Sequence, residues 1–178
     1  IGDDLDRLGL PMQVKNNTAE HGTAFTVTVD SKFGITSGIS SADRAHTIQL
    51  LADLESSAAN FVQPGHVFPL RYEEGGVLVR AGHTEGSVDL VRLAGKHPAA
   101  VICEILNDDG TMARRPQLET TAHKHDFPIV TIADVIAYRM SHEKLVERGA
   151  EARLPTAHGV FKAIAYKSFV DPSEHIAI

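Results

Sequence analysis

The sequence predicts an α/β (α+β) fold in which a mixed sheet is layered with helices. Its 178 residues suffice for one domain with a sizeable core. A hydrophobic fraction of 43% and a charged fraction of 22% are typical of globular proteins and argue against disorder. Strand-like and helix-like segments alternate in the second half of the chain, which is the pattern of α/β folds.

The first half is predicted to contain three strands and one helix. Residues 23–30 alternate and are rich in β-branched side chains, so they predict a strand with one buried face. Residues 40–54 carry apolar side chains at helical spacing, after a serine that can cap a helix. Short strands are expected at 67–70 and 77–79, each following a break that contains glycine.

The second half begins with a helix that we expect Thr84 to cap and Gly95 to end. Residues 99–106 are nearly all apolar, which predicts a strand covered on both faces. The remaining predicted elements are helices at 116–125 and 132–147 and a strand at 129–132.

A change of character after the last predicted helix marks a domain boundary. Residues 1–148 are predicted to form the main domain, and residues 149–178 a linker and the beginning of another domain. The second segment contains one or two possible strands, too few to bury a core of their own. Ile1 follows no helix cap or start signal, and we expect further residues before it.

The composition excludes several classes of protein. The net charge is -6 and the basic residues are scattered, so a nucleic-acid partner is not expected. No apolar run approaches the roughly 20 residues of a membrane helix, so no membrane partner is expected either. The single cysteine, Cys103, cannot form an intramolecular disulfide and is predicted to be a small buried hydrophobe. A cytoplasmic location is therefore expected.

Residues 80–85, Arg-Ala-Gly-His-Thr-Glu, pass from a predicted strand through glycine into a helix start. Free N–H groups and the positive helix end favour an anion there. Arg80 can contact a phosphate through two N–H donors, Thr84 can add its hydroxyl, and His83 can ligate a metal or carry a proton. The alternative interpretation is an ordinary helix start with a surface histidine.

Two further residues stand where a structural role is less natural. Glu104 lies inside the apolar run 99–106, where desolvation would raise the pKa of its carboxyl toward the range useful for acid/base catalysis. His66 lies between Pro64-Gly65 and Pro69, which restrict the backbone and hold a histidine in one orientation. A strand-end carboxylate in a structural ion pair and an exposed loop histidine are the alternatives.

Several blocks in the same order and spacing resemble 3,4-dihydroxy-2-butanone 4-phosphate synthase of riboflavin biosynthesis. The resemblance extends from Ile1 to Glu147. The blocks are Arg44, Pro64–Leu70, Gly82–Glu85 with Val88-Asp89-Leu90, and Cys103-Glu104 with Asn107–Arg114.

The resemblance implies a lyase that converts D-ribulose 5-phosphate into 3,4-dihydroxy-2-butanone 4-phosphate and formate, with Mg2+ or Mn2+ as metal. It also implies a homodimer with sites at the interface. By resemblance, His66 and Glu104 transfer protons, and His83 is a metal ligand. The residues implied to bind substrate are Ser37, Arg80, Ala81, Gly82, His83, Thr84 and Glu104. A metal ion would polarise the ketose oxygens while acid and base groups move protons.

The sequence also departs from the family. An acidic Arg-Glu-Asn-Glu loop, which the family carries in its N-terminal part, has no counterpart in the 178 residues. Residues 153–178 resemble the opening of GTP cyclohydrolase II, as in bifunctional riboflavin biosynthesis proteins, but contain none of that domain's cysteine ligands for zinc. Little synthase activity is therefore expected of the chain alone. The alternative function is an inactive binding or dimerisation module that keeps the synthase fold.

Overall fold

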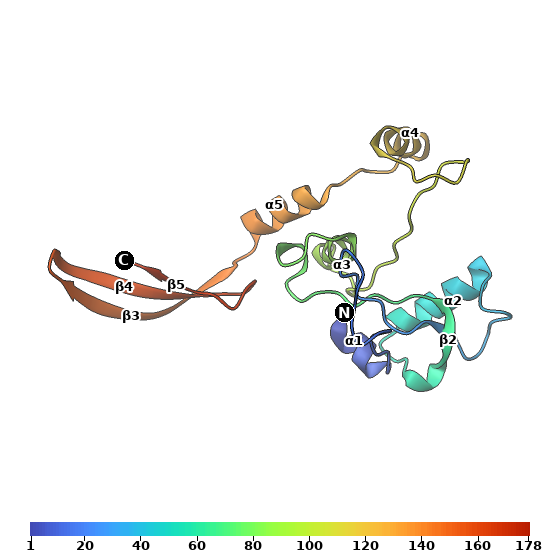
Figure 1. The fold of residues 1–178 in the computed structure, drawn as a ribbon, viewed down its shortest axis with the longest axis horizontal. Coiled ribbons are helices and arrows are strands. Elements are labelled where there is room, and N and C mark those ends of the chain that lie inside the picture. Colours follow the sequence, from blue (N-terminus) through green and yellow to red (C-terminus); the bar gives the residue numbers. More distant parts are fainter.

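Residues 1–178 are described by a computed structural model, in which a mixed α/β body is followed by a projecting sheet (Figure 1). The helices are α1 (Gly2–Arg7), α2 (Ser41–Ala52), α3 (His83–Leu93), α4 (Arg115–His125) and α5 (Ile132–His142), with short 3-10 helices η1 (Ala58–Asn60) and η2 (Gly76–Leu78). The strands are β1 (Val29–Ser31), β2 (Phe61–Val67), β3 (Val146–Thr156), β4 (Gly159–Ser168) and β5 (Glu174–Ala177). The predicted α/β class is confirmed.

The four predicted helices are present with shifted ends. Ser40 caps α2, because its hydroxyl accepts a hydrogen bond from the Asp43 N–H at 3.1 Å. Gly95, with a φ of +67°, follows α3 and supplies the left-handed turn that ends it. The predicted cap at Thr84 is wrong: Gly82 is the N-cap of α3, and Thr84 lies one residue inside the helix.

The two sheets are antiparallel. β1 pairs with β2 through Val29 opposite Val67 and Ser31 opposite Phe61, with a register shift after Val29. β3, β4 and β5 form the second sheet in that order. The predicted strand at 23–30 is therefore shortened to β1, preceded by isolated bridges at Phe25 and Thr26.

The predicted strand at 67–70 is wrong beyond its first residue, because β2 ends at Val67, and three further predicted strands are wrong throughout. Residues 77–79 fall in and just after η2, and residues 99–106 and 129–132 form no strand. The only pairing within 99–106 is an isolated bridge between Leu106 and Met112. An apolar run makes burial favourable, but a strand also needs a neighbouring strand for its backbone hydrogen bonds, and these segments find none among residues 1–178.

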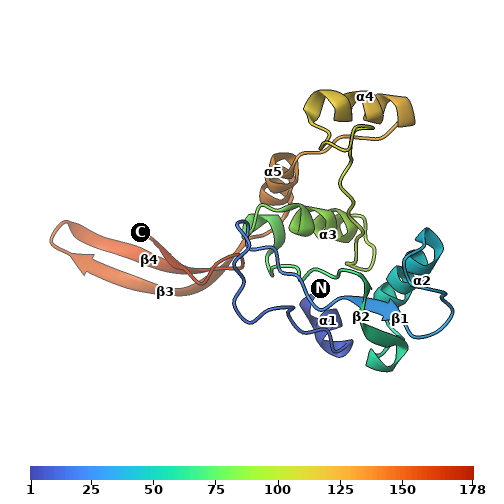
Figure 2. The same ribbon diagram turned by 45° about the vertical axis from the view of Figure 1, so that its right-hand side comes forward.

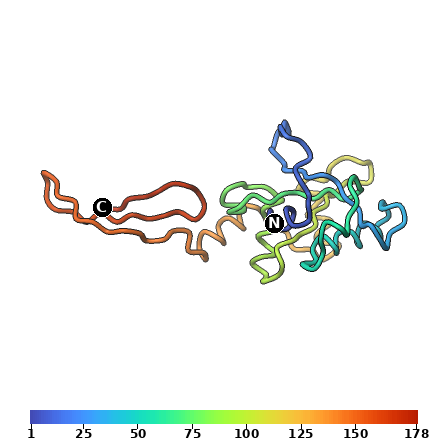
Figure 3. Tube along the Cα trace, turned by 90° about the horizontal axis from the view of Figure 1, so that it is seen from below, coloured from blue at the N-terminus to red at the C-terminus, as the bar shows by residue number.

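The buried core is small and lies under α1, β1 and β2. Its buried members are Leu5, Leu8, Leu10, Val29 and Phe61. By contrast, α4 has no buried residue and stands apart from the body in both views (Figures 1 and 2). The sheet β3–β5 projects away from the body at the end of α5, as the chain trace in Figure 3 also shows.

β3 runs from Val146 to Thr156 with a register shift against β4 between Arg148 and Glu151, whereas the sequence predicts that the preceding helix reaches residue 147. All its residues are exposed. No helix of the structure combines the length and the hydrophobicity that crossing a membrane requires.

Candidate functional site

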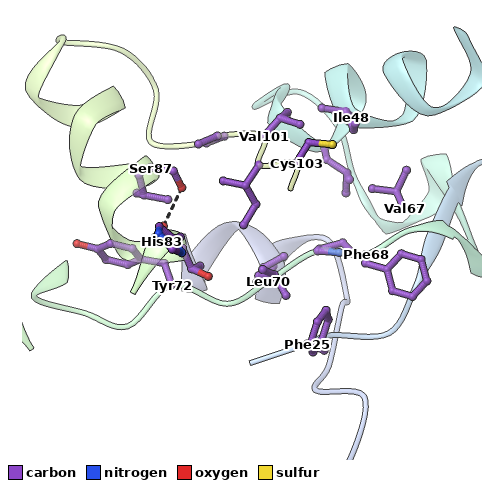
Figure 4. A pocket seen from close by; sticks show the side chains of 18 of the residues that line it. Phe25, Ile48, Val67, Phe68, Leu70, Tyr72, His83, Ser87, Val101 and Cys103 are labelled. Carbon is purple, nitrogen blue, oxygen red and sulfur yellow. Dashed lines mark hydrogen bonds between the residues drawn. The ribbon is translucent and has the colours of Figure 1, made fainter. Parts of the chain in front are cut away.

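A cavity of about 1190 Å³ lies in the body, and its wall is assembled from segments far apart in the sequence. Figure 4 shows His83 and Ser87 of α3 on one side, Val101 and Cys103 from the segment after α3, and Ile48 of α2. Somewhat more than half of the lining residues are hydrophobic and most of the others are polar, a mixture that suits a small ligand with charged groups. The polar lining residues include His66, Arg80, His83, Thr84 and Glu104.

The N-terminus of α3 faces this cavity through residues 80–84. The first hydrogen bond of α3 runs from the Gly86 N–H to the Gly82 carbonyl at 2.9 Å, so the N–H groups of residues 83–85 are not used within the helix. The Thr84 hydroxyl makes no hydrogen bond in the chain, whereas the Ser87 hydroxyl donates to the Thr84 carbonyl at 2.9 Å (Figure 4). Donors that suit an anion are therefore gathered at this helix end.

Arg80 is held in place by two partners. Its Nη1 donates to Oε2 of Glu85 at 2.5 Å, and its Nη2 donates to the His21 carbonyl at 2.9 Å. Glu85 is almost fully buried, and its other carboxylate oxygen accepts the Glu73 N–H at 3.2 Å. Two of the five guanidinium donors are thus engaged within the chain, and the side chain remains 29% exposed, so other donors can reach a ligand.

A buried polar network anchors the turn that precedes Arg80. Asp89, which is 1% exposed, accepts hydrogen bonds from the Tyr72 hydroxyl at 2.9 Å, the Val77 N–H at 2.9 Å and Arg139 Nη1 at 2.8 Å. The same nitrogen of Arg139 donates to the Gly75 carbonyl at 2.8 Å. One carboxylate therefore ties η2 to both α3 and α5.

The network raises the pKa values of two of its members. Burial, together with the hydrogen bond to Asp89, raises the pKa of Tyr72 to about 12. The paired hydrogen bonds of Arg139 to Glu143, at 2.7 and 2.8 Å, raise the pKa of its guanidinium above the usual value, and Asp89 adds to that. The protonated forms of both groups are thus stabilised further by the contacts of the network.

His66 is paired with a carboxylate. Its Nδ1 lies 2.7 Å from Oδ2 of Asp30, and its backbone N–H donates to Oδ1 of the same residue at 2.9 Å. Asp30 is 5% exposed, while the histidine side chain is 42% exposed and lines the cavity. The predicted rigidity of His66 thus has a second source beyond the flanking prolines.

Two expectations about the segment 99–106 are wrong. Glu104 and Cys103 are exposed rather than buried, because the segment forms no strand and nothing covers it. Both residues still line the cavity. Glu104 is therefore a carboxylate on the exposed part of the cavity wall and not one enclosed in a strand.

Ser37 is the one predicted substrate-binding residue that does not line the cavity. It is exposed and lies next to Gly38, which packs against Asp30 and His66. The loop around it is held by Asp43, whose carboxylate accepts from the Thr36 hydroxyl at 2.8 Å and the Gly38 N–H at 3.0 Å. The Thr36 hydroxyl is the main cause of the lowered pKa of the Asp43 carboxyl.

The residues of the chain do not make a complete metal site. His83 lines the cavity, but no three His, Cys, Asp or Glu side chains come together in a group that could hold an ion. A tightly bound divalent cation needs more ligands than one imidazole. A metal at His83 would therefore need ligands in addition to those that surround His83 in one chain.

Sequence reasoning missed Asp30, Glu85 as the partner of Arg80, and the network of Asp89, Arg139 and Tyr72. Asp30 is the last residue of the alternating segment 23–30, and an aspartate in that position is typical of the beginning of a turn. Arg139 lies 50 residues from Asp89, and nothing local marks a pair so far apart. Asp89 could have been noticed in the sequence, because it is a charged residue between Val88 and Leu90 at the start of an apolar helix face.

The sequence matches the 3,4-dihydroxy-2-butanone 4-phosphate synthase family over residues 2–138. It is 55% identical over 179 residues to the riboflavin biosynthesis protein RibBA of Nocardia farcinica and 54% identical over 178 residues to the chloroplastic bifunctional protein RIBA 1 of Arabidopsis thaliana. Both alignments cover 99% of this chain but only 43% and 33% of those proteins. The chain thus spans less than half the length of these relatives.

Solved structures agree with the sequence relatives. The two-domain synthase RibBX of A. baumannii superposes with a TM-score of 0.87 at 47% identity, over 98% of this chain and 52% of that one. A 3,4-dihydroxy-2-butanone 4-phosphate synthase in complex with two magnesium ions superposes with a TM-score of 0.70 at 36% identity, over 79% of this chain and 70% of that one. With residues 2–138 matched and the same fold found at this identity, the chain belongs to the 3,4-dihydroxy-2-butanone 4-phosphate synthase family.

Proposed function

We propose that the protein to which this chain belongs converts D-ribulose 5-phosphate into 3,4-dihydroxy-2-butanone 4-phosphate and formate. One observation carries the proposal: a single cavity is lined by a helix end with free N–H groups, a carboxylate and a histidine that contacts a buried aspartate. A sugar phosphate needs the first feature for binding, and movement of protons on its carbon skeleton needs the other two.

The phosphate is proposed to bind at residues 80–84. Arg80 has donors left after its bonds to Glu85 and His21, the Thr84 hydroxyl is unused, and three backbone N–H groups precede the first bond of α3. Loss of a charged hydrogen-bond partner costs on the order of 1.5–3 kcal/mol, or about ten- to a hundredfold in affinity. We expect Arg80→Ala to weaken ribulose 5-phosphate binding by this factor in calorimetric titrations, and unchanged binding would exclude Arg80 from the site.

The proton transfers are proposed to use His66 and Glu104, with Ser37, Ala81 and Gly82 as further substrate contacts. His66 retains one ring nitrogen that Asp30 does not occupy. Glu104 is exposed to the cavity, so its carboxylate is accessible to a ligand. Two such groups allow one to remove a proton while the other returns one.

A divalent cation, Mg2+ or Mn2+, is proposed to bind with His83 as one ligand. The incomplete ligand set among residues 1–178 predicts weak affinity for this chain by itself. Mn2+ binding followed by paramagnetic relaxation, with substrate present, should weaken further in His83→Ala. Equal affinities in the two proteins would remove His83 from the metal site.

We propose that the chain functions as a homodimer. Its accessible surface is 12341 Å², whereas a folded monomer of 19.2 kDa is expected to expose roughly 8,400 Å². Exposed apolar side chains lie on the loosely packed region after α3, among them Val101, Phe127, Val130 and Met140. A second copy that covers this region would account for part of the excess area, as obligate interfaces do.

Residues 149–178 are proposed to begin a second domain, similar to GTP cyclohydrolase II. The sheet β3–β5 has almost no buried residue and projects from the body, so it requires further chain to form a core. We further propose a cytoplasmic location, since the one cysteine is free and exposed, as a reducing compartment permits.

The decisive experiment measures formate release from ribulose 5-phosphate by the full-length protein with Mg2+. Glu104→Gln and His66→Ala should each lower kcat by about 10²–10⁴-fold, the usual contribution of a general acid or base. Glu55→Gln and His158→Ala, both at exposed positions outside the cavity, are the matched controls.

The second candidate, an inactive binding or dimerisation module, is favoured by the lack of a three-ligand metal group in this chain. Absence of formate release from the full-length wild-type protein, with substrate binding and dimerisation retained, would support the module and contradict the synthase assignment. Release that is equally fast in Glu104→Gln would show that another group transfers the proton.

A further inference from the structure

We propose that Asp30 is a positioning residue that fixes His66 as the tautomer with its proton on Nδ1, so that Nε2 is the basic nitrogen offered to the cavity. This role rests on the proposed function of His66. The tautomer itself can be measured without any activity, which keeps the two ideas separable.

The two oxygens of Asp30 have different tasks. Oδ1 accepts the backbone N–H of His66 at 2.9 Å, which fixes the main chain, and Oδ2 lies 2.7 Å from Nδ1, which fixes the ring. A carboxylate can only accept hydrogen bonds, so Nδ1 must carry the proton in the neutral imidazole. Nε2 then holds the lone pair.

The irregular pairing of β1 with β2 brings the two residues together. Between Val29 and Asp30 the register shifts, so that Val29 lies opposite Val67 while Asp30 lies opposite Val62. Gly65 sits at the resulting close approach, where an added Cβ would be 2.0 Å from the carbonyl carbon of Val29. Such bulges re-aim side chains, and here the bulge directs His66 onto Asp30.

Gly38 covers the pair. An added Cβ at this position would lie 2.3 Å from Oδ2 of Asp30 and 2.8 Å from Nδ1 of His66, so only glycine permits the contact. Its φ of +87° also favours glycine, and Asp43 holds it by accepting its N–H at 3.0 Å. The loop 36–38 therefore excludes other groups from the hydrogen bond between Asp30 and His66.

Asp30→Asn provides a sharp test because the geometry dictates how the amide must lie. The backbone N–H of His66 can only donate, so the amide oxygen of Asn stays on that side and the amide nitrogen faces Nδ1. The nitrogen donates, so Nδ1 must become the acceptor and the proton must move to Nε2. The substitution reverses the tautomer while leaving the size of the side chain almost unchanged.

The experiment combines two readouts on the full-length protein. Nitrogen-15 spectra of labelled histidine, with the His66 signals assigned by their loss in His66→Ala, should show protonated Nδ1 in wild type and protonated Nε2 in Asp30→Asn. The kcat for formate release should fall about 10²–10⁴-fold in Asp30→Asn, with the KM for ribulose 5-phosphate little changed. Asp3→Asn, at an exposed position in α1, is the matched control and should behave as wild type.

A neutral wild-type His66 with its single proton on Nε2 would overturn the proposal, even if Asp30→Asn failed to fold. A tautomer reversed without loss of kcat would show that the orientation has no role in the reaction. In the His66→Ala background, Asp30→Asn should cause no further fall in kcat. An additional fall would show that Asp30 acts through another group. A wild type without synthase activity but with the expected tautomers would refute the proposed function and leave the positioning intact.

Discussion

Asp89→Ala removes the acceptor at the centre of the buried network below Arg80. Three donors lose their partner: the Tyr72 hydroxyl, the Val77 N–H and one N–H of Arg139. Breaking a buried ion pair by removing one member typically costs about 3–5 kcal/mol. Arg139 keeps its bonds to Glu143 and to the Gly75 carbonyl, so the lower end, about 3 kcal/mol, is expected.

Urea unfolding followed by far-ultraviolet circular dichroism measures this loss. With a slope of about 2 kcal/mol per molar urea, the midpoint should fall by roughly 1.5 M. Asp108→Ala, at an exposed position that makes no side-chain hydrogen bond, should leave the midpoint unchanged. Arg139→Met should also destabilise, and the double variant should lose less than the sum of the two, because it leaves no lone buried charge. A midpoint for Asp89→Ala within experimental error of wild type would refute the reasoning.

Three further outcomes follow from the same contacts. Tyr72 should titrate near pH 12 in absorbance measurements. Because the pKa of Tyr72 is raised on folding, its contribution to the free energy of unfolding is complete below about pH 10 and is lost as the pH rises toward 12. The variant Tyr72→Phe should not show this loss of stability. Asp43, whose pKa is lowered, contributes stability above its unfolded pKa and loses it in acid, so the difference in melting temperature between wild type and Asp43→Asn should narrow as the pH falls below about 4. Glu85→Gln should weaken phosphate binding at Arg80 without abolishing it, and an affinity equal to wild type would show that Glu85 does not orient the guanidinium.

Local signals predicted the helices well. Ser40 provides the cap of α2 and Gly95 the left-handed end of α3, and both effects depend only on residues a few positions away. The strands were predicted less accurately, because a strand forms only if another strand lies beside it. Residues 99–106 have the composition of a buried strand, but the 178 residues supply no neighbour for them.

The candidate site divides in the same way. The segment 80–84 was found because a glycine before a helix start concentrates its donors within five residues. His66 was found through its flanking prolines, but its partner Asp30 was not, since the pair depends on a register shift between two strands. Glu104 was chosen for its expected burial, and the structure places it in the cavity wall while leaving it exposed.

The contacts that shape the cavity also determine when it can form during folding. His66 meets Asp30 across 36 residues, Arg80 meets His21 across 59, and Arg139 meets Asp89 across 50. Closing such loops costs conformational entropy before any contact repays it, so these pairs form slowly compared with the helices. The helix end at residues 83–85 can fold early together with the local pair Arg80–Glu85, yet Arg80 gains its second partner, the His21 carbonyl, only once that distant segment has docked. An isolated peptide spanning residues 76–95 would therefore form part of α3 but would lack the contact from His21 that completes the placement of Arg80.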